Sequence, residues 1–403
     1  MSEWKEVRLG EITSIIGDGI HGTPVYSEQG DYYFINGNNL CEGRIVLKPD
    51  TKRVSEEEYH KHKKELNSRT LLFSINGTVG NVAKYNGEPC ILGKSACYFN
   101  VLNTVDKDFI YYVISSPSFV KSMSNLANGT TIKNVSLKQM RDKTFLLPSF
   151  ETQQRISSIL SSLDSKIENN RKICANLEAQ AQALFKHWFI DFAPFKDGKF
   201  VESELGMIPE GWRVGKLGDL TEFLNGFAFK SSSFVSKGKY KVITIKAVQD
   251  GKLITDSADE IEDLSLNIPS HCVLKIGDIL LSLTGNVGRV CIVTQDNLVL
   301  NQRVCILNPR NLIDRGYVYT LSRTKLLKTR MINIAKGTAQ ANLSPVETSK
   351  LSIVVPPRYI LDKFGIIANE YMSEIISAYQ ENQLLSSLRD TLLPKLMSGE
   401  IKV

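Results

Sequence analysis

Hydrophobic and polar residues follow two different periods along this chain. Short stretches rich in β-branched and aromatic residues, such as YYFIN at 32–36 and KVITI at 241–245, predict β-strands. LLFSINGTVGNVAKY at 71–85 and ILLSLTGNVGRVCIV at 279–293 each place such residues on both sides of a polar, glycine-containing centre. This pattern predicts two β-hairpins whose glycines shape the turn, and it argues against a loop that cradles a phosphate.

A different period begins after Pro148, where apolar residues recur at alternating spacings of four and three. Residues 151–191 contain neither proline nor glycine, so one helix of about 35 residues, roughly 50 Å long, is expected there. A second helix of this kind is expected after Pro356. The apolar seams predict that the two helices pair with each other, although each helix could instead pack on its own half of the chain. The predicted pairing residues are Ile156, Leu160, Leu163, Ile167, Leu177, Leu184, Phe364, Ile375, Leu385 and Leu392.

Two asparagines, Asn170 and Asn382, interrupt these apolar seams. A polar residue in such a seam specifies the register of paired helices at some cost in stability. The two side chains are therefore expected to set how the helices align.

The chain contains the same unit twice. SINGTVG begins at Ser74 and SLTGNVG at Ser282, and 282 − 74 = 208; the same offset relates Trp4 to Trp212. A constant offset along a whole half predicts a duplicated domain and not a short-period solenoid. The expected fold is α+β, with a strand-rich domain at 1–148, a long helix at 149–190, a linker at 191–208, a second strand-rich domain at 209–356 and a second long helix at 357–398.

Composition narrows the class of protein without deciding its function. The 403 residues exceed what one hydrophobic core usually holds, and no apolar run or leader-like N-terminus predicts a membrane or secreted protein, so a cytoplasmic protein is expected. The seven cysteines are an odd number and show no CxxC spacing, which argues against a disulfide framework or a zinc site. A net charge of +6 permits a nucleic-acid partner but does not require one.

Several short motifs suggest enzymes but lack the context that the chemistry needs. GDGIHG at 17–22 matches a dinucleotide-binding spacing, yet no helix pattern follows it. GEPCILGKS at 87–95 has one residue too many for a phosphate-binding loop, and VPPRY at 355–359 falls short of a methyltransferase motif. No catalytic or metal-binding residue is predicted. A run of six basic residues and no acidic residue at 315–346 suits either a phosphate-facing surface or a solvated helix face.

Longer stretches of the sequence resemble a known family. They are LPSFETQQRI at 147–156, FKHWFIDFAPFKDGKFVESE at 185–204, LGMIPEGWRVGKLGDL at 205–220, GTAQANLS at 337–344 and LLPKLMSGEIKV at 392–403. Together they resemble the specificity subunit of type I restriction-modification systems, over both halves and in the family's order. One departure is RYILDKFG at 358–365, which lacks the Glu and Gln residues of the matching FETQQRI, so a methyltransferase contact there is expected to differ.

The resemblance implies that each strand-rich domain is a target-recognition domain that reads one half of a split DNA sequence. It also implies that the two helices pack antiparallel with pseudo-twofold symmetry, set the spacing of the half-sites and hold methyltransferase subunits, of which two are expected, and through them restriction subunits. The chain itself is expected to be non-catalytic and to bind no cofactor, whereas the partner methyltransferase uses S-adenosylmethionine. Because the two domains differ in sequence, the target is expected to be asymmetric.

Base edges are read mainly by amide, hydroxyl and basic side chains, so such residues in the predicted turns are the candidates for DNA contact. Each of them could instead form a turn or touch a phosphate, and His21, in the loop GIHGTP, could simply bond to backbone. The candidates are Asp18, His21, Thr23, Asn36, Asn38, Asn76, Thr78 and Lys133 in the first domain, and Lys230, Lys246, Thr284, Asn286, Arg289, Arg303 and Gln340 in the second.

Two other functions stay open from the residues alone. A duplicated coiled-coil adaptor would bind only protein, and its complexes would show no preference among DNA sequences. A self-standing DNA-modifying enzyme would methylate DNA without a partner subunit.

Overall fold

The structure is a computed structural model that describes residues 4–127, 133–337 and 341–403. The chain divides into two compact units, and each is described by itself. Unit 1 consists of Met1–Ser165 with Leu385–Val403, and unit 2 consists of Lys166–Leu384. Each unit therefore contains one strand-rich half of the sequence together with a segment of each long helix.

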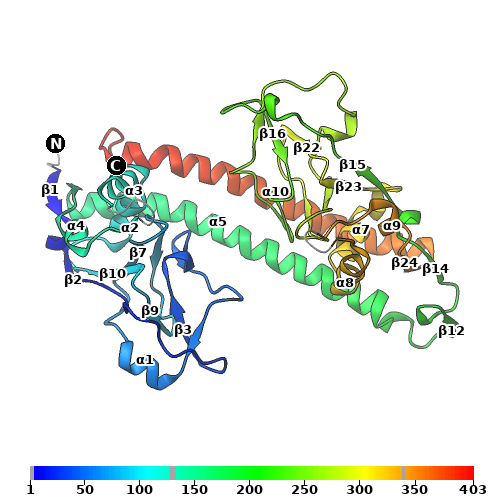
Figure 1. Cartoon of the computed structure of the whole chain (residues 1–403), viewed down its shortest axis with the longest axis horizontal. Helices are drawn as coiled ribbons and strands as arrows, with labels where there is room; N and C mark the ends of the chain where they lie inside the picture. Colours follow the sequence, from blue (N-terminus) through cyan, green and yellow to red (C-terminus); the bar gives the residue numbers. More distant parts are fainter. Residues whose placement is uncertain (1–3, 128–132, 338–340) are drawn as a thin grey trace. The chain divides into compact units, whose positions relative to one another are not determined.

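Unit 1 is built on a four-stranded antiparallel sheet beside a smaller three-stranded sheet (Figure 1). The larger sheet has the order β2 (Thr13–Asp18), β10 (Ala96–Val101), β7 (Thr70–Ser74), β8 (Val82–Lys84). The smaller has the order β6 (Arg53–Val54), β3 (Tyr32–Ile35), β9 (Cys90–Leu92), with β3 and β9 parallel. The other elements are β1 (Lys5–Arg8) paired with β11 (Thr144–Leu147), β4 (Leu40–Cys41) paired with β5 (Arg44–Ile45), α1 (Glu56–His62), α2 (Lys107–Ser115), α3 (Pro117–Leu126) and α4 (Leu137–Asp142).

Unit 2 repeats this arrangement. Its larger sheet has the order β15 (Thr221–Asn225), β23 (Val304–Pro309), β20 (Ile279–Ser282), β21 (Val290–Ile292), and its smaller sheet has the order β19 (Glu260–Ile261), β16 (Tyr240–Ile243), β22 (Leu298–Leu300). The other elements are β14 (Arg213–Lys216) paired with β24 (Ser352–Val355), β17 (Val248–Gln249) with β18 (Lys252–Leu253), β12 (Phe200–Ser203) with β13 (Gly206–Pro209), α6 (Leu217–Leu220), α7 (Arg315–Ser322), α8 (Lys325–Ile334) and α9 (Pro345–Ser349). The predicted duplication is confirmed at the level of strand order.

The two glycine-containing turns are hairpin turns, as predicted. Strands β7 and β8 pair antiparallel around residues 75–81, and β20 and β21 pair in the same way around residues 283–289. In the first turn Gly77 and Gly80 have φ of 74° and 105°, and in the second Gly285 and Gly288 have φ of 69° and 78°. Only glycine adopts such angles without strain, which explains why both copies keep glycines there.

The offset of 208 changes at β2, because β2 holds one more residue than its counterpart β15. In β2, Val101 pairs with Thr13 and Asn100 pairs with Ile15, so Ser14 is an extra residue in the ladder. Strand β15 pairs without such a shift. Such a bulge bends and twists the strand locally. Residues 15–20 therefore correspond to unit 2 at an offset of 207, and Ile20 bridges Gly93 where Phe227 bridges Asn301.

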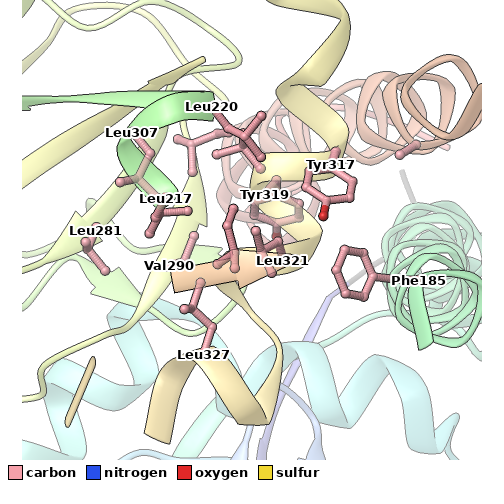
Figure 2. Close-up of a cluster of buried hydrophobic side chains, with 14 of the residues drawn as sticks. Phe185, Leu217, Leu220, Leu281, Val290, Leu307, Tyr317, Tyr319, Leu321 and Leu327 are labelled. Carbon is pink, nitrogen blue, oxygen red and sulfur yellow. The ribbon is translucent and has the colours of Figure 1, made fainter. Parts of the chain in front are cut away.

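The core of unit 2 joins its sheet to helix α5 (Phe150–Phe185) and helix α10 (Arg358–Met397). Figure 2 shows Phe185 reaching from α5 towards Tyr317 on α7, and their ring centroids are 5.3 Å apart. Phe364 of α10 completes this aromatic cluster at 5.8 Å from Phe185. After Phe185 the chain makes one π-helical turn, Lys186–Ile190.

Within unit 2 the two long helices run antiparallel. Asn170 of α5 donates from Nδ2 to Oδ1 of Asn382 on α10 at 3.0 Å, and both side chains are buried. Cys174, one turn further along α5, lies against Ile375, which is earlier in α10. The interrupting asparagines therefore face each other, as expected of residues that set register.

The seam residues divide their contacts between the partner helix and the strand-rich halves. Ile156 and Leu160 of α5 lie in the core of unit 1 with Leu393 and Leu396 of α10, but also with residues of α2. Both packing arrangements considered from the sequence thus occur on the same helices. Of the predicted pairing residues, Ile156, Leu160, Ile167, Phe364 and Ile375 are buried, and Leu163, Leu177, Leu184, Leu385 and Leu392 are half-buried.

Candidate nucleic-acid interface

In unit 1, loops from five parts of the sequence meet at one edge of the sheets. Ile20 forms a parallel bridge with Gly93, and Gly37 N donates to Ser95 Oγ at 2.9 Å. The turn after β7 joins them, because Ile75 N donates to Ser95 O at 3.0 Å and Gly77 N donates to Lys133 O at 3.0 Å. This surface, called edge 1 below, comprises residues 18–23, 36–38, 75–81, 93–95 and 133–134.

Unit 2 forms the same edge from the matching loops. Phe227 bridges Asn301, and Leu283 N donates to Arg303 O at 3.0 Å. Gly285 N donates to Ala341 O at 3.3 Å, which brings the last loop to the hairpin turn. Edge 2 comprises residues 227–230, 244–246, 283–289, 301–303, 336–337 and 341–342.

On edge 1 the candidate side chains divide into exposed groups and groups that hold the loops together. His21 is 73% exposed and pairs through Nε2 with Asp18 Oδ2 at 2.8 Å. Asn36 accepts from Ser95 Oγ at 3.0 Å, and Asn76 donates to the Asn134 side chain at 3.3 Å, so these two amides have structural partners. The remaining candidates, Thr23, Asn38, Thr78 and Lys133, are exposed.

On edge 2 the exposed candidates are Lys230, Lys246, Asn286 and Arg303. Thr284 is half-buried, and its hydroxyl oxygen has no hydrogen-bond partner within the described chain. The Arg289 guanidinium donates to the Gln249 side chain at the end of β17. Gln340 lies outside the described residues. Edge 2 thus gathers the described candidates of the second half as edge 1 gathers those of the first.

Comparison with known protein families decides which family carries this arrangement. A family model described as "Type I restriction modification DNA specificity domain" matches residues 1–179 and again residues 209–390. The chain belongs to this family. The two strand-rich halves are therefore two specificity domains in tandem, and the recognition made from the sequence is confirmed.

Curated relatives match this specificity protein over its whole length. The type I restriction enzyme MjaIX specificity subunit of Methanocaldococcus jannaschii is 27% identical, covering 100% of this chain and 94% of the relative. The HindI specificity subunit of Haemophilus influenzae is 24% identical over 100% of both chains. A crystal structure of the system's S subunit from M. genitalium covers 98% of this chain with a TM-score of 0.56 at 19% identity, which supports the fold.

Two further exposed lysines lie on the edges: Lys94, which the sequence did not indicate as a DNA contact, and Lys336, a member of the basic run at 315–346. Lys94 lies on edge 1 between Gly93 and Ser95, and Lys336 lies on edge 2, where its backbone bridges Asn342. Lys94 belongs to GEPCILGKS, whose spacing resembles a phosphate-binding loop and gives no sign of a DNA contact. The signal in the sequence that points to Lys94 is its neighbour Ser95, which aligns with the candidate Arg303 at the offset of 208.

The basic run at 315–346 is neither one phosphate-facing surface nor one solvated face. Arg323 pairs with Glu178, Lys328 Nζ lies 2.6 Å from Asp250, and Arg330 Nη1 donates to a backbone carbonyl at 2.6 Å. Lys336 is the member of the run that lies on edge 2. Two ion pairs and one hydrogen bond to a backbone carbonyl thus account for three of the six basic residues.

A polar cluster links the second specificity domain to helix α5. Glu178 of α5 accepts from Tyr319 Oη at 2.7 Å and from the Arg323 guanidinium, both from the α7 region. Arg323 also stacks over the Tyr319 ring at 5.2 Å and lies 3.7 Å from Asp250. Burial raises the pKa of Tyr319 well above its usual value, so the phenol stays a hydrogen-bond donor.

In unit 1 a polar cluster also links the specificity domain to the long helices, but its two charged side chains both belong to the helices. Asp164 of α5 accepts from Tyr112 Oη of α2 at 2.6 Å and from Arg389 Nη1 of α10 at 2.8 Å. Burial and the hydrogen bond to Asp164 raise the pKa of Tyr112. Ser115 stands where unit 2 has Arg323, and a cavity of about 440 Å³ opens beside it.

The described residues contain no group of three or more His, Cys, Asp or Glu side chains that could hold a metal ion. No helix within the described ranges is long and apolar enough to cross a membrane.

Proposed function

We propose that this chain is the non-catalytic recognition subunit of a type I restriction-modification complex. In this proposal edge 1 reads one half of a bipartite DNA target and edge 2 reads the other. The observation that supports it best is the pair of matched edges, each formed by loops from distant parts of its half and each presenting exposed amide, hydroxyl and basic groups. Such groups are the ones that distinguish base edges in the major groove.

The two edges present different side chains at matching positions, so the proposed target is asymmetric. Asn38 is matched by Lys246, and Thr78 by Asn286, at the same places in the two folds. An amide and an ammonium group favour different base edges. Equal half-sites would require matching contact groups, which these edges do not have.

The long helices are the proposed docking surface for two methyltransferase subunits, which bring S-adenosylmethionine and through which restriction subunits join. The length of the helices sets the spacing of the two half-sites in this proposal. The complex is proposed to act in the cytoplasm.

The test is to map methylated adenines in DNA treated with the purified chain, with its methyltransferase subunit, and with both. The proposal expects methylation at one bipartite motif only when both are present. Methylation by the chain alone would establish a self-standing enzyme, and methylation that does not depend on the chain would favour an adaptor.

Two single substitutions test which edge reads which half of the DNA target. Thr78→Ala is expected to relax specificity at one or two positions of one half-site, and Asn286→Ala at positions of the other. A well-placed base contact contributes about 1–3 kcal/mol of discrimination, which corresponds to about 5–150-fold. If either substitution altered both halves of the motif, the assignment of one edge to one half-site would be wrong.

A further inference from the structure

The two edges differ in charge more than in shape. Edge 2 carries four exposed basic side chains: Lys230, Lys246, Arg303 and Lys336. Its described residues include no acidic side chain. A fifth cation, Arg289, is half-buried and donates to Gln249.

Edge 1 carries half as many exposed lysine and arginine side chains. Lys94 and Lys133 are exposed, and the edge also includes Asp18, which pairs with His21 at 2.8 Å. Apart from Asp18 and His21, the other residues of the edge are glycines, asparagines, threonines, isoleucines, a serine and a valine, which are uncharged. Of the six exposed cations on both edges, none forms an ion pair within 4.0 Å with another described residue.

We infer that the second specificity domain supplies most of the electrostatic attraction to the DNA backbone, whereas the first reads its half-site mainly through uncharged groups. This inference rests on the proposed function, because it requires both edges to face DNA. Unpaired exposed cations are the groups that neutralise phosphates on binding, whereas uncharged amides and hydroxyls contribute no counterion release. Edge 2 is thus the anchoring surface for any DNA sequence.

The inference has a measurable magnitude. Each phosphate neutralised contributes about −0.9 to the slope of log K against log salt concentration. If each exposed cation neutralises one phosphate, edge 2 contributes about −3.6 to this slope and edge 1 about −1.8. Between 50 and 200 mM salt, these slopes correspond to losses of affinity of about 150-fold and about 12-fold.

The experiment measures binding of the assembled complex with its methyltransferase subunits to a fluorescent DNA that contains the mapped target, between 50 and 200 mM KCl. Three proteins are compared with the unmodified complex: an edge-2 variant with K230Q, K246Q, R303Q and K336Q, an edge-1 variant with K94Q and K133Q, and the control K239Q. Lys239 is an exposed lysine of the same domain that precedes β16, whereas Lys246 follows that strand at its other end.

The edge-2 variant is expected to lose about 3.6 units of slope, the edge-1 variant about 1.8, and K239Q less than about 0.5. The edge-2 variant should weaken binding to target and to unrelated DNA by similar factors, since phosphate contacts carry no sequence information. The four edge-2 substitutions made singly should each remove about 0.9, which separates lost contacts from a misfolded domain.

An equal or larger loss of slope in the edge-1 variant would overturn the inference, as would an unchanged slope in the edge-2 variant. Either result would leave the proposed function intact if the complex still preferred its target. Failure of the proposed function has a different signature, namely an unmodified complex that binds target and unrelated DNA equally.

Discussion

Replacing Glu178 by alanine tests the polar cluster that links the second specificity domain to helix α5. The substitution removes the acceptor of the Tyr319 phenol and the ion-pair partner of Arg323. The side chains of Glu178 and Arg323 are only 20% and 15% exposed, so the guanidinium that remains cannot be fully solvated. An uncompensated buried charge is among the few causes of large losses of stability.

The expected loss follows from the contacts that remain. Breaking a buried ion pair costs about 3–5 kcal/mol when the other charge has no alternative partner. Arg323 keeps Tyr319 Oη at 2.9 Å and the more distant Asp250 carboxylate at 3.7 Å, which offset part of this cost. The lost acceptor of Tyr319 adds about 1 kcal/mol. We therefore expect Glu178→Ala to lower the free energy of unfolding of unit 2 by about 3 kcal/mol, and Glu178→Gln, which keeps an acceptor, by about half as much.

Tryptophan fluorescence during urea unfolding reports selectively on this unit. Trp188 and Trp212 lie in unit 2, and replacing Trp4 by phenylalanine removes the one tryptophan of unit 1. With a slope of about 2–3 kcal/mol per molar urea, a loss of 3 kcal/mol lowers the midpoint by about 1 M. Gln180→Ala, an exposed position on the same helix, is the control.

A double-mutant cycle with Arg323→Met isolates the pair. The reasoning predicts a coupling energy of about 2 kcal/mol or more between Glu178 and Arg323. A coupling below about 0.5 kcal/mol, or a midpoint for Glu178→Ala equal to that of Gln180→Ala, would refute the account of the cluster as a buried clamp.

Three further predictions concern stability. Replacing Asn170 by leucine should lower the urea midpoint, because it leaves the buried Asn382 amide without its partner. Asn382→Leu should cost less, because Asn170 Nδ2 keeps its hydrogen bond to Glu381 Oε2 at 2.6 Å. The double leucine variant should raise the free energy of unfolding by about 1 kcal/mol, and a double variant less stable than both singles would contradict this. Gly80→Ala should lower the free energy of unfolding by more than 2 kcal/mol, because a Cβ there would lie 2.3 Å from a side-chain carbon of Val120. Gly77→Ala should lower it by about 1 kcal/mol, because a Cβ there meets nothing within 4 Å. Equal losses in thermal or urea unfolding would contradict the role of packing. Burial raises the pKa of Cys291 and of Cys305. The stability that the neutral thiols contribute is therefore present below the unfolded thiol pKa of about 8.5, and above that pH it falls by about 1.4 kcal/mol per pH unit for each thiol. The urea midpoint should be lower at pH 10 than at pH 8, and equal midpoints would rule this effect out.

The sequence predicted the elements whose signals are local. Alternation of β-branched residues around Gly77 and Gly285 sufficed for both hairpins, because the turn and both strands lie within about 15 residues. The bulge at Ser14 escaped prediction, since it arises from how β2 pairs with β10, about 85 residues away in the sequence. Helices such as α2 also escaped, because nine residues are too few for a periodic pattern to stand out from strand-like apolar runs.

The candidate site was predictable in outline and not in detail. The turn residues proposed as candidates lie close together because the loops of both sheets end at one edge, and residues as distant as Ile20 and Gly93 meet there. Which of these side chains are available depends on contacts that no local pattern reveals. Asn36 is held by Ser95, and Arg289 by Gln249, 40 residues away. Lys94 could not be predicted because its loop reaches the edge only through the contacts of Gly93 with Ile20 and of Ser95 with Gly37.

The polar cluster of Glu178, Tyr319 and Arg323 also limits how freely the second specificity domain can be exchanged. Glu178 belongs to the helix of the first repeat, whereas Tyr319 and Arg323 belong to the second domain. Exchange of residues 209–356 therefore removes Tyr319 and Arg323 and leaves Glu178 on α5. In unit 1 the carboxylate is Asp164 of α5 and the arginine is Arg389 of α10. The first specificity domain therefore contributes only the neutral phenol of Tyr112 to this cluster. A domain placed after α5 must supply a cation for Glu178, whereas a domain placed at the N-terminal position must supply only a hydrogen-bond donor for Asp164. The two positions thus demand different charges from domains of the same fold, and a first domain moved unchanged into the second position would bring Ser115 to Glu178 and leave that carboxylate without its cation.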